Sequence, residues 1–323
     1  MVKKVCLLTF CLAGSLFVIA ALALQPSSAM LRQLFENALR RQKVEHGLSD
    51  PRTAQAARDL GLFLRTQGDT AGACDALDEA VRIDEKALGP AAAQTLADVA
   101  ELAVVSAPGQ AEALWRRAAE SPDAKMAARA LAALGQLREE ASDSADAAKL
   151  YRRALIQEEV ASGRDSAPVA SRLNALSRVV DLPEAIALLD RAVDISRRHL
   201  GARHPETATL ELNLAGLLLK AGHADQAAQS AAEAMSIFEE VLGSGHQRTA
   251  AAAIIRAHAL RAKGDAGGAE RMYRQALAID EQAGLRSPRT LTDARTLAEF
   301  LREIGKQREA AELEKKMLGA TPR

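Results

Sequence analysis

Hydrophobic residues recur at helical spacing in the middle of the chain. Leu210, Leu214 and Leu217 lie three or four positions apart, as residues on one face of an α-helix do. Pro205 precedes this stripe, where proline fits a first helical turn, and Gly222 follows it, where glycine ends a helix. A second stripe consists of Ala227, Ala231, Ala234, Ile237 and Phe238. The pattern predicts two amphipathic helices joined by a short turn.

The same pattern recurs along the chain with a nearly constant period. His204-Pro205-Glu206-Thr207 is followed 42 residues later by His246-Gln247-Arg248-Thr249, and Gly264 follows Gly222 at the same offset. Residues 47–53 and 284–290 are identical at five of seven positions. A single helical bundle with alanine-rich faces is the alternative, but a bundle needs no fixed period. The self-similarity therefore indicates a tandem array of helix pairs.

These units resemble the tetratricopeptide repeat (TPR), in the longer variant of the kinesin light chains. The usual repeat is about 34 residues long. Here the period is 42 residues, with the phrases Leu-Gly, His-Pro and Thr-Ala within residues 200–208. The resemblance implies an all-α protein, a right-handed α-solenoid of tandem antiparallel helix pairs that forms a TPR superhelix.

The resemblance also implies four positions in each unit where the helices meet closely. The small position of the first helix is Gly61, Ala100, Gly135, Ser177, Ala215, Ala257 and Ala298. The alanine early in the second helix is Ala73, Ala111, Ala147, Ala185, Ala227, Ala269 and Ala310. The bulky position after it is Leu77, Trp115, Tyr151, Leu189, Ala231 and Tyr273. The next small position is Ala80, Ala118, Ala154, Ala192, Ala234 and Ala276.

The repeat register divides most of the chain into two parts. Residues 47–319 are expected to form the TPR solenoid, with about seven helix pairs. Residues 30–46 are expected to form an N-terminal capping helix, because Phe35 aligns with Tyr273 of a second helix. Two units depart from the pattern. The second helix around Trp115 is expected to stop near Pro122, and the unit around Asn174 lacks about one turn.

Residues 1–29 have the layout of a secretory signal peptide. Lys3 and Lys4 give a basic start, residues 5–24 are almost entirely apolar, and small residues at Ser27 and Ala29 make a cleavage site. The alternative is an uncleaved membrane anchor, because about 20 apolar residues span a bilayer. We expect an exported protein, periplasmic or secreted, or one anchored in the membrane by residues 5–24.

Composition and charge support helices and exclude broad electrostatic binding. Hydrophobic residues make up 48% of the chain and aromatic residues only 3%, and alanine and leucine favour helix. The 42 basic and 42 acidic residues cancel, so no nucleic-acid partner is expected. Of the three cysteines, only Cys74 lies beyond the N-terminal segment, where it is expected to be a small core residue.

The sequence contains no recognisable motif for catalysis, metal binding or a cofactor. No His-Glu-x-x-His, zinc-type Cys/His spacing, P-loop or nucleophile elbow is present. His204 and His246 occupy equivalent repeat positions before a helix, where they are expected to cap or orient the turn. We therefore expect no enzymatic activity, no metal and no cofactor.

The first helices of a TPR array line the inside of its curve, so their polar residues are candidates for peptide binding. By register with the family this set is Arg58, Arg65, Arg129, Asn174, Arg178, Asn213, His258, Arg261, Arg295 and Arg302. Arginine and asparagine can hydrogen-bond peptide carbonyls, and arginine can pair with carboxylates. The excess of arginine favours an acidic or carboxylate-bearing ligand. The alternative is that these residues are only the polar face of amphipathic helices.

These observations predict a scaffold that binds a partner protein or peptide in the concave TPR groove. A membrane would be a partner only if the N-terminal segment is retained. The alternative is a regulatory or self-assembling subunit of an envelope complex, with Trp115 as an exposed self-contact.

Overall fold

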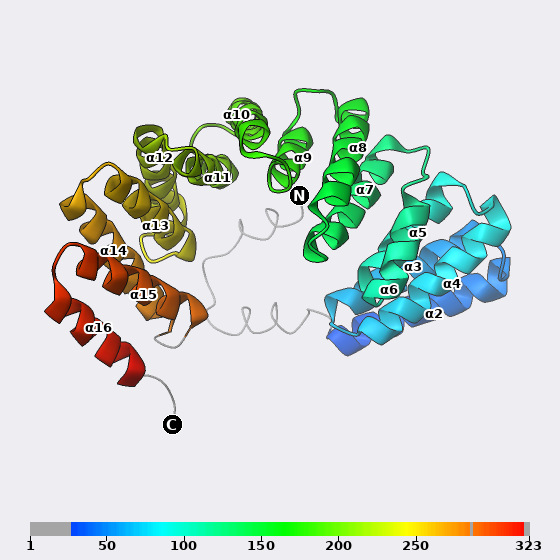
Figure 1. Cartoon of the computed structure of the whole chain (residues 1–323). Helices are drawn as coiled ribbons and strands as arrows, with labels where there is room; N and C mark the ends of the chain where they lie inside the picture. The colour runs from blue at the N-terminus through cyan, green and yellow to red at the C-terminus, as the bar shows by residue number, and fades with distance from the viewer. Residues whose placement is uncertain (1–26, 285–286, 320–323) are drawn as a thin grey trace, which may run out of the picture. The chain divides into compact units, whose positions relative to one another are not determined.

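The computed structural model describes residues 27–284 and 287–319, whose regular secondary structure is α-helix alone, with no strand among them (Figure 1). The all-α prediction is confirmed. The chain divides into two compact units, residues 1–122 and 123–323, which we call unit 1 and unit 2 and describe separately. The predicted signal peptide falls on residues 1–29, of which 1–26 lie outside the described residues.

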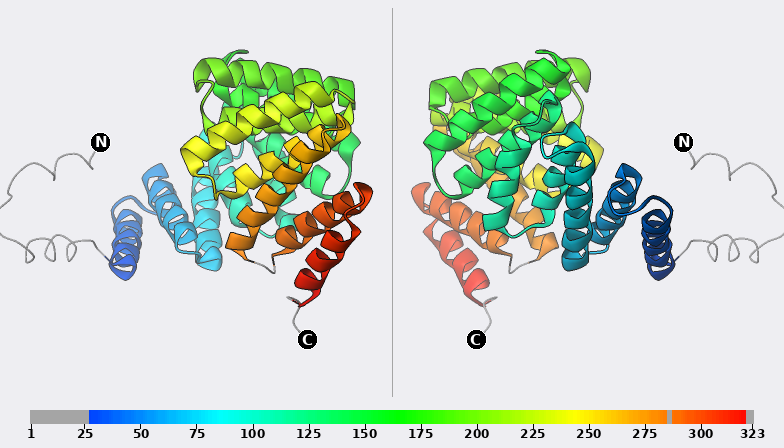
Figure 2. Two further views of the ribbon diagram at one scale, coloured as in Figure 1. Left: turned by 90° about the vertical axis from the view of Figure 1, so that its left-hand side faces the viewer. Right: turned by 90° about the vertical axis from the view of Figure 1, so that its right-hand side faces the viewer.

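Each unit is a succession of helix pairs joined by short turns. Unit 1 contains α2 (Ser28–His46), α3 (Pro51–Thr66), α4 (Thr70–Leu88), α5 (Ala93–Val105) and α6 (Pro108–Ala118). Unit 2 contains α7 (Ala124–Glu140), α8 (Ser144–Ser162), α9 (Ala167–Ser177), α10 (Leu182–His199), α11 (Pro205–Lys220), α12 (Ala224–Leu242), α13 (Gln247–Ala262), α14 (Ala266–Ala283), α15 (Pro288–Glu303) and α16 (Gln307–Gly319). From α3 onward, odd-numbered helices are the first of a pair and even-numbered helices the second. Figure 2 shows the pairs from α11 to α16 following one another along unit 2.

The positions inferred from the repeat register are buried. The alanine early in the second helix is buried in every repeat. The next small position, and the bulky position between the two, are buried at all the residues named for them above. At two small positions the fit excludes even a methyl group. A Cβ on Gly135 would lie 2.7 Å from the ring of Tyr151, and one on Gly61 would lie 2.6 Å from Leu77 Cγ. Small residues therefore let the two helices of a pair approach closely.

A threonine hydrogen bond closes most connections between pairs. The hydroxyl of Thr207 donates to the carbonyl oxygen of Gly201 at 2.9 Å, and that of Thr249 donates to Gly243 at 3.1 Å. Thr53, Thr95 and Thr290 make the same bond to the glycine six residues earlier. All five threonines are buried. This bond explains why glycine and threonine recur at a fixed spacing in the sequence.

The two repeat histidines cap helices, as predicted. Nδ1 of His204 accepts a hydrogen bond from the backbone N–H of Glu206 at 3.1 Å, and Nδ1 of His246 accepts one from Arg248 at 3.1 Å. Each imidazole thereby satisfies one of the N–H groups that a helix leaves unpaired at its start.

Helix α2 covers the first pair of unit 1. Leu39 is buried with α3 and α4 residues, and the ring of Phe35 stacks on Phe63 of α3 with centroids 5.0 Å apart. The helix begins at Ser28, two residues before the expected start of the capping helix. The hydroxyl of Ser27 accepts the backbone N–H of Met30 at 3.2 Å.

The two irregular repeats, around Trp115 and around Asn174, contain short helices, as expected. Helix α6 has 11 residues, against 19 in the second helices α4, α8 and α12. Helix α9 has 11 residues, against 16 in the first helices α3, α11 and α13. The expectation that Trp115 is an exposed contact is wrong, because its side chain is only 7% exposed. Trp115 occupies the bulky position of its repeat, which faces the partner helix rather than solvent.

Ion pairs connect second helices across consecutive repeats of unit 2. Arg152 of α8 pairs with Glu184 of α10 at 2.8 Å, and Lys316 of α16 pairs with Glu281 of α14 at 2.6 Å. The two residues of each pair are separated by roughly one repeat, so the charged outer faces follow the same register as the core. Exposed pairs of this kind each contribute about 0–1 kcal/mol.

Candidate functional site

First helices of unit 2 line an open cavity of about 980 Å³, which we call the first-helix groove. Its walls come from α9, α11 and α13, together with the end of α7 and the start of α10. The lining includes Glu139, Asn174, Arg178, Leu212, Asn213, Gly216, Leu217, Lys220, Ile255 and His258. The groove is therefore largely apolar at its bed and polar along one stripe, the composition of many ligand-binding clefts.

The structure brings four of the predicted site residues together in this groove: Asn174, Arg178, Asn213 and His258. The two asparagines occupy consecutive repeats. Nδ2 of Asn213 donates to Oδ1 of Asn174 at 3.0 Å. This bond leaves the amide nitrogen of Asn174 and the amide oxygen of Asn213 with no side-chain partner recorded in residues 27–284 and 287–319. Together they offer one donor and one acceptor to a ligand.

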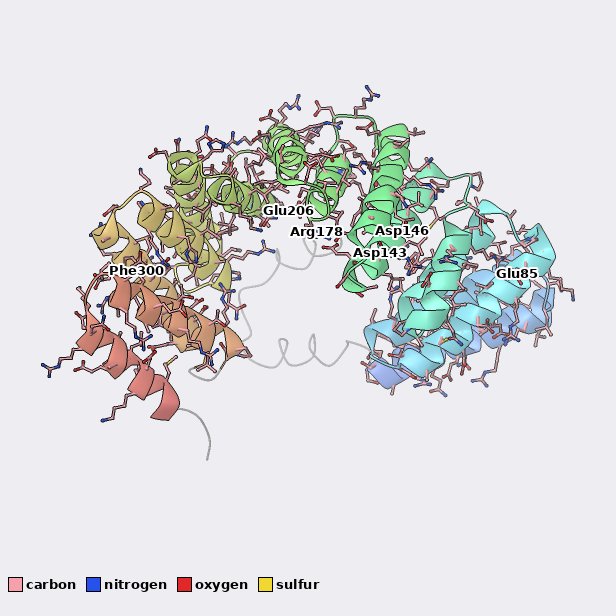
Figure 3. The ribbon with its side chains drawn as sticks, in the orientation of Figure 1. Glu85, Asp143, Asp146, Arg178, Glu206 and Phe300 are labelled. Carbon is pink, nitrogen blue, oxygen red and sulfur yellow. The ribbon has the colours of Figure 1, made fainter. Side chains whose placement is uncertain are left out.

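Arg178 is held at the end of α9 by an acid from the preceding repeat. Figure 3 labels Arg178 on the ribbon of unit 2. The Nε and Nη2 atoms of Arg178 both donate to the carboxylate of Glu139 at 2.8 Å, and the Tyr151 hydroxyl donates to the same carboxylate at 2.8 Å. The Arg178 hydrogen bonds hold the pKa of Glu139 below its usual value. The guanidinium is half-exposed, and the carboxylate of Glu139 compensates part of its positive charge. A ligand anion would have to share it.

His258 contributes a neutral ring to the groove. Its Nδ1 lies 2.8 Å from the hydroxyl of Tyr273, and the two rings meet edge to face. Burial, followed by the positive charge of Arg261, lowers the pKa of His258. The imidazole is therefore uncharged at neutral pH and acts as a hydrogen-bonding and packing group rather than a cation.

Three other predicted arginines lie outside the groove lining, on α13 and α15 toward the C-terminal end of unit 2. Arg261 pairs with Glu303, and Arg302 pairs with Glu314. Arg295 is exposed on α15, with no ion pair recorded among the described residues. Arg129 is half-buried on α7, also outside the lining.

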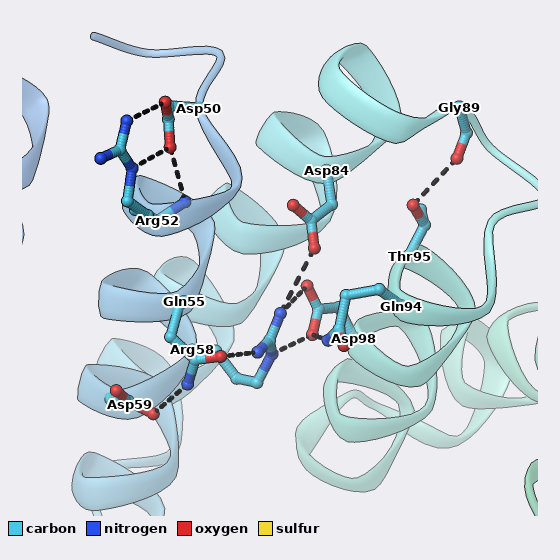
Figure 4. Close-up of polar contacts among 10 residues, drawn as sticks. All are labelled: Asp50, Arg52, Gln55, Arg58, Asp59, Asp84, Gly89, Gln94, Thr95 and Asp98. Atoms are coloured by element: carbon cyan, nitrogen blue, oxygen red, sulfur yellow. Dashed lines mark hydrogen bonds and ion pairs between the residues drawn. The ribbon is translucent and has the colours of Figure 1, made fainter. Parts of the chain in front are cut away.

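The remaining two predicted residues belong to unit 1. Arg65 of α3 pairs with Glu101 of α5 at 2.8 Å. Arg58 is only 12% exposed and donates to Asp98 and Asp84, both buried carboxylates, as Figure 4 shows. Its Nη1 also contacts Gln55. Because its donors are used inside the protein, we reassign Arg58 from ligand binding to the stabilisation of unit 1.

The sequence interpretation missed Lys220, the cation of this groove with no ion pair recorded in the described chain. Lys220 lies at the end of α11, seven residues after Asn213, with Gly216 and Leu217 between them on the same face. Because residues three, four and seven positions after Asn213 share its helical face, the sequence spacing could have identified all three.

Among residues 27–284 and 287–319 there is no cluster of three or more His, Cys, Asp or Glu side chains placed to hold a metal ion. No helix within the same ranges is both long and apolar enough to span a bilayer. Cys74 is half-buried with a free thiol.

Comparison with known proteins identifies the repeat. Two sequence profiles described as tetratricopeptide repeat match the chain, one at residues 174–240 and 208–282 and the other at residues 32–87. No curated protein matches the sequence significantly. The profile matches agree with the resemblance read from the repeat phrases.

Solved structures of similar fold cover most of the chain. BtubC (BKLC) from P. vanneervenii is 20% identical, with a TM-score of 0.55 over 68% of this chain and 95% of its own. A putative kinesin light chain from Podosopora anserina with nearly identical TPR-like repeats is 22% identical, with a TM-score of 0.53 over 59% of this chain and 93% of its own. PilF from Pseudomonas aeruginosa is 20% identical, with a TM-score of 0.50 over 74% and 95%. At such identities the likeness is one of fold, an α-solenoid of TPR helix pairs. The profile matches and this fold together show that the chain belongs to the tetratricopeptide repeat family.

Proposed function

We propose that this TPR protein is an exported scaffold that binds an extended segment of a partner protein in the first-helix groove and catalyses no reaction. The observation that carries the proposal is the asparagine pair along the groove. Asn174 and Asn213 sit one repeat apart and leave a donor and an acceptor for a peptide main chain. A TPR fold supports protein binding in general, and the groove supplies the specific surface.

The bed of the groove suits alternate side chains of an extended peptide. Leu212, Leu217 and Ile255 provide apolar contact, and Gly216 lets a ligand approach the backbone of α11. A cavity of about 980 Å³ accommodates a segment of a few residues rather than a folded domain. Apolar burial then supplies affinity, while the asparagines fix the position of the main chain.

Charge in the groove favours a ligand with a carboxylate. Lys220 has no ion pair recorded among the described residues, Arg178 is shared with Glu139, and His258 is neutral at pH 7. We propose that an acidic side chain or a C-terminal carboxylate of the partner segment pairs with Lys220. The affinity of such a ligand would fall as salt rises, because exposed charges are screened.

Selection from a displayed peptide library on the secreted form tests the groove. Selected peptides should carry an acidic residue, and hydrogen exchange should slow in α9, α11 and α13 when they bind. Asn174→Ala combined with Asn213→Ala should weaken binding at least tenfold. Gln110→Ala, which removes an exposed amide from α6 in unit 1, should change nothing. Protection confined to second helices, or unchanged binding by the double variant, would refute the groove.

N-terminal sequencing of the mature protein tests export separately. A start at Met30 supports cleavage of a signal peptide after Ala29, and a start at Met1 or Val2 supports an anchor formed by residues 5–24. Cleavage at this site would also remove Ser27, whose hydroxyl caps α2. The alternative of a self-assembling envelope subunit loses the contact from which it was argued, because Trp115 is buried. Sedimentation at micromolar concentration measures self-association directly.

A further inference from the structure

A second cavity of about 840 Å³ lies between α10, α11 and α12 of unit 2, and we call it the second-helix cavity. Its lining residues are entirely different from those of the first-helix groove. Val193, Leu214 and Leu218 give it an apolar floor, while acidic side chains stand around it. A charged rim over an apolar floor suits a ligand that has both characters.

Four carboxylates from three helices line the second-helix cavity. Asp190 and Asp194 lie one turn apart on α10, Glu211 comes from α11, and Glu233 comes from α12. No hydrogen bond or ion pair of the Asp190 or Asp194 carboxylate is recorded within the described ranges. Partial burial, followed by the negative charge of Asp194, raises the pKa of Asp190.

Among the residues that line the cavity, one guanidinium, that of Arg197, forms ion pairs with two of these acids. Arg197 of α10 contacts Oε1 of Glu211 at 2.8 Å and Glu233 at 3.7 Å. Glu211 is only 3% exposed, and its second oxygen, Oε2, has no hydrogen-bond partner within the part of the chain that the structure describes. A buried carboxylate oxygen is normally hydrogen-bonded, so this oxygen in the cavity wall can accept a hydrogen bond from a ligand. The cavity thus has an excess of negative charge and an unsatisfied acceptor.

We propose that the second-helix cavity binds an organic cation, a guanidinium or alkylammonium group carried on an apolar stem. The cation donates to Glu211 Oε2 and to the Asp190 and Asp194 carboxylates, while the stem lies on Leu214 and Leu218. A bare metal ion is a poorer match, because these acids form no cluster of metal-binding geometry. Arginine or lysine side chains of a basic peptide and free polyamines share the required chemistry.

Calorimetric titration of the full chain at low salt tests the proposal with three probes. They are acetyl-Arg-Gly-Arg-amide, spermidine, and acetyl-citrulline-Gly-citrulline-amide, which has the shape of the first without its charge. Saturable binding is expected for at least one cationic probe and not for the citrulline peptide. The tighter of the two cations identifies the source, a basic peptide or a polyamine. Failure of both cations, or equal binding of the neutral peptide, would overturn the proposal.

Two variants locate the binding. Asp190→Asn with Asp194→Asn should weaken the cation at least tenfold, which is about 1.4 kcal/mol. Asp75→Asn with Asp78→Asn removes the same charge from α4, where Asp75 is exposed and Asp78 is half-exposed, and should leave the Kd unchanged. An equal loss in both double variants would indicate nonspecific attraction and overturn the site.

Arg197→Gln provides an independent test, because it should change the affinity in the opposite direction. Because this substitution removes the cation that competes for Glu211 and Glu233, it should tighten probe binding by roughly threefold. Arg152→Gln removes an equal charge from exposed α8, where Arg152 pairs with Glu184, and should have no such effect. Weaker binding by Arg197→Gln, or tightening of equal size in both variants, would contradict the proposed geometry.

Discussion

The guanidinium of Arg178, the residue that follows α9, donates two hydrogen bonds of 2.8 Å to the carboxylate of Glu139, which lies 39 residues earlier on α7. Asn213 and Asn174, also 39 residues apart, make an equivalent link between α11 and α9. These polar residues of the first helices therefore already use part of their hydrogen-bonding capacity in contacts with the neighbouring repeat. What remains for a ligand is the part of each side chain that these links leave unused.

Replacement of Arg178 by alanine should lower the free energy of unfolding by about 1 kcal/mol, because the pair is partly exposed. Glu139 has a lowered pKa in the folded state. Its contribution is therefore present at neutral pH and is lost as the pH falls through the folded-state pKa. Urea denaturation of Arg178→Ala, Glu139→Gln and the double variant checks the coupling. Strictly additive effects would mean that the pair does not stabilise unit 2.

Replacement of Arg58 should be far more damaging than replacement of Arg65. Loss of Arg58 leaves Asp84 and Asp98 buried without a cation, and breaking a buried pair costs about 3–5 kcal/mol (Figure 4). Arg65→Ala removes only a partly exposed pair and should lower stability by less than about 1 kcal/mol. Hydrogen exchange of the backbone amides in α3 to α5 measures the loss of stability in both variants. Similar exchange in the two variants would show that the buried cluster has no special role.

Asp293→Asn should stabilise the protein at high pH. Burial, together with the neighbouring Asp280, raises the pKa of Asp293 to about 7. Because the folded state holds this proton more tightly than the unfolded chain, stability falls as the pH rises from about 4 to 7. Asparagine resembles the protonated acid, so the variant should gain about 1 kcal/mol or more at pH 8.5 and almost nothing at pH 4. The half-exposed Asp78→Asn substitution is the control, and unfolding midpoints across this pH range check the sign.

Gly135→Ala and Gly216→Ala should change stability in opposite directions. A methyl group at Gly135 would collide with the Tyr151 ring, and such overpacking costs about 1–3 kcal/mol. At Gly216, in the middle of α11, nothing lies within 4 Å, so alanine should stabilise the helix by up to about 1 kcal/mol. Thermal unfolding compares the two variants. Stabilisation by Gly135→Ala would mean that α7 and α8 readjust easily.

Local chemistry explains why so much of the fold is predictable from the sequence. Proline and histidine at helix starts and glycine at helix ends act within a few residues, so the helix pairs follow from the pattern alone. The period then determines the register of the core. Ala80, Ala154 and Ala234 are all completely buried, as their place in the repeat predicts. The resemblance to TPR proteins was readable for the same reason.

Availability of side chains for binding is not a local property. The sequence placed Arg58 and Arg178 in one class, yet Arg58 is held by two buried acids, and one of them, Asp98, lies 40 residues away. Lys220 went unnoticed because only the packing of α9, α11 and α13 reveals which face of α11 lines a groove. Trp115 was expected at the surface, but a large side chain at an inward repeat position is buried by its neighbours.

The sequence by itself determined the helices, their pairing and the buried small positions, because these depend on spacing and on contacts within one repeat. Only the tertiary structure decided which polar residues are already paired. It also showed that Oε2 of Glu211 has no partner among the described residues, and that the first-helix groove and the second-helix cavity have different linings. The physical reason is that charges meet their partners across repeats. The free energy of such a pair depends on burial and geometry that residue order alone does not specify.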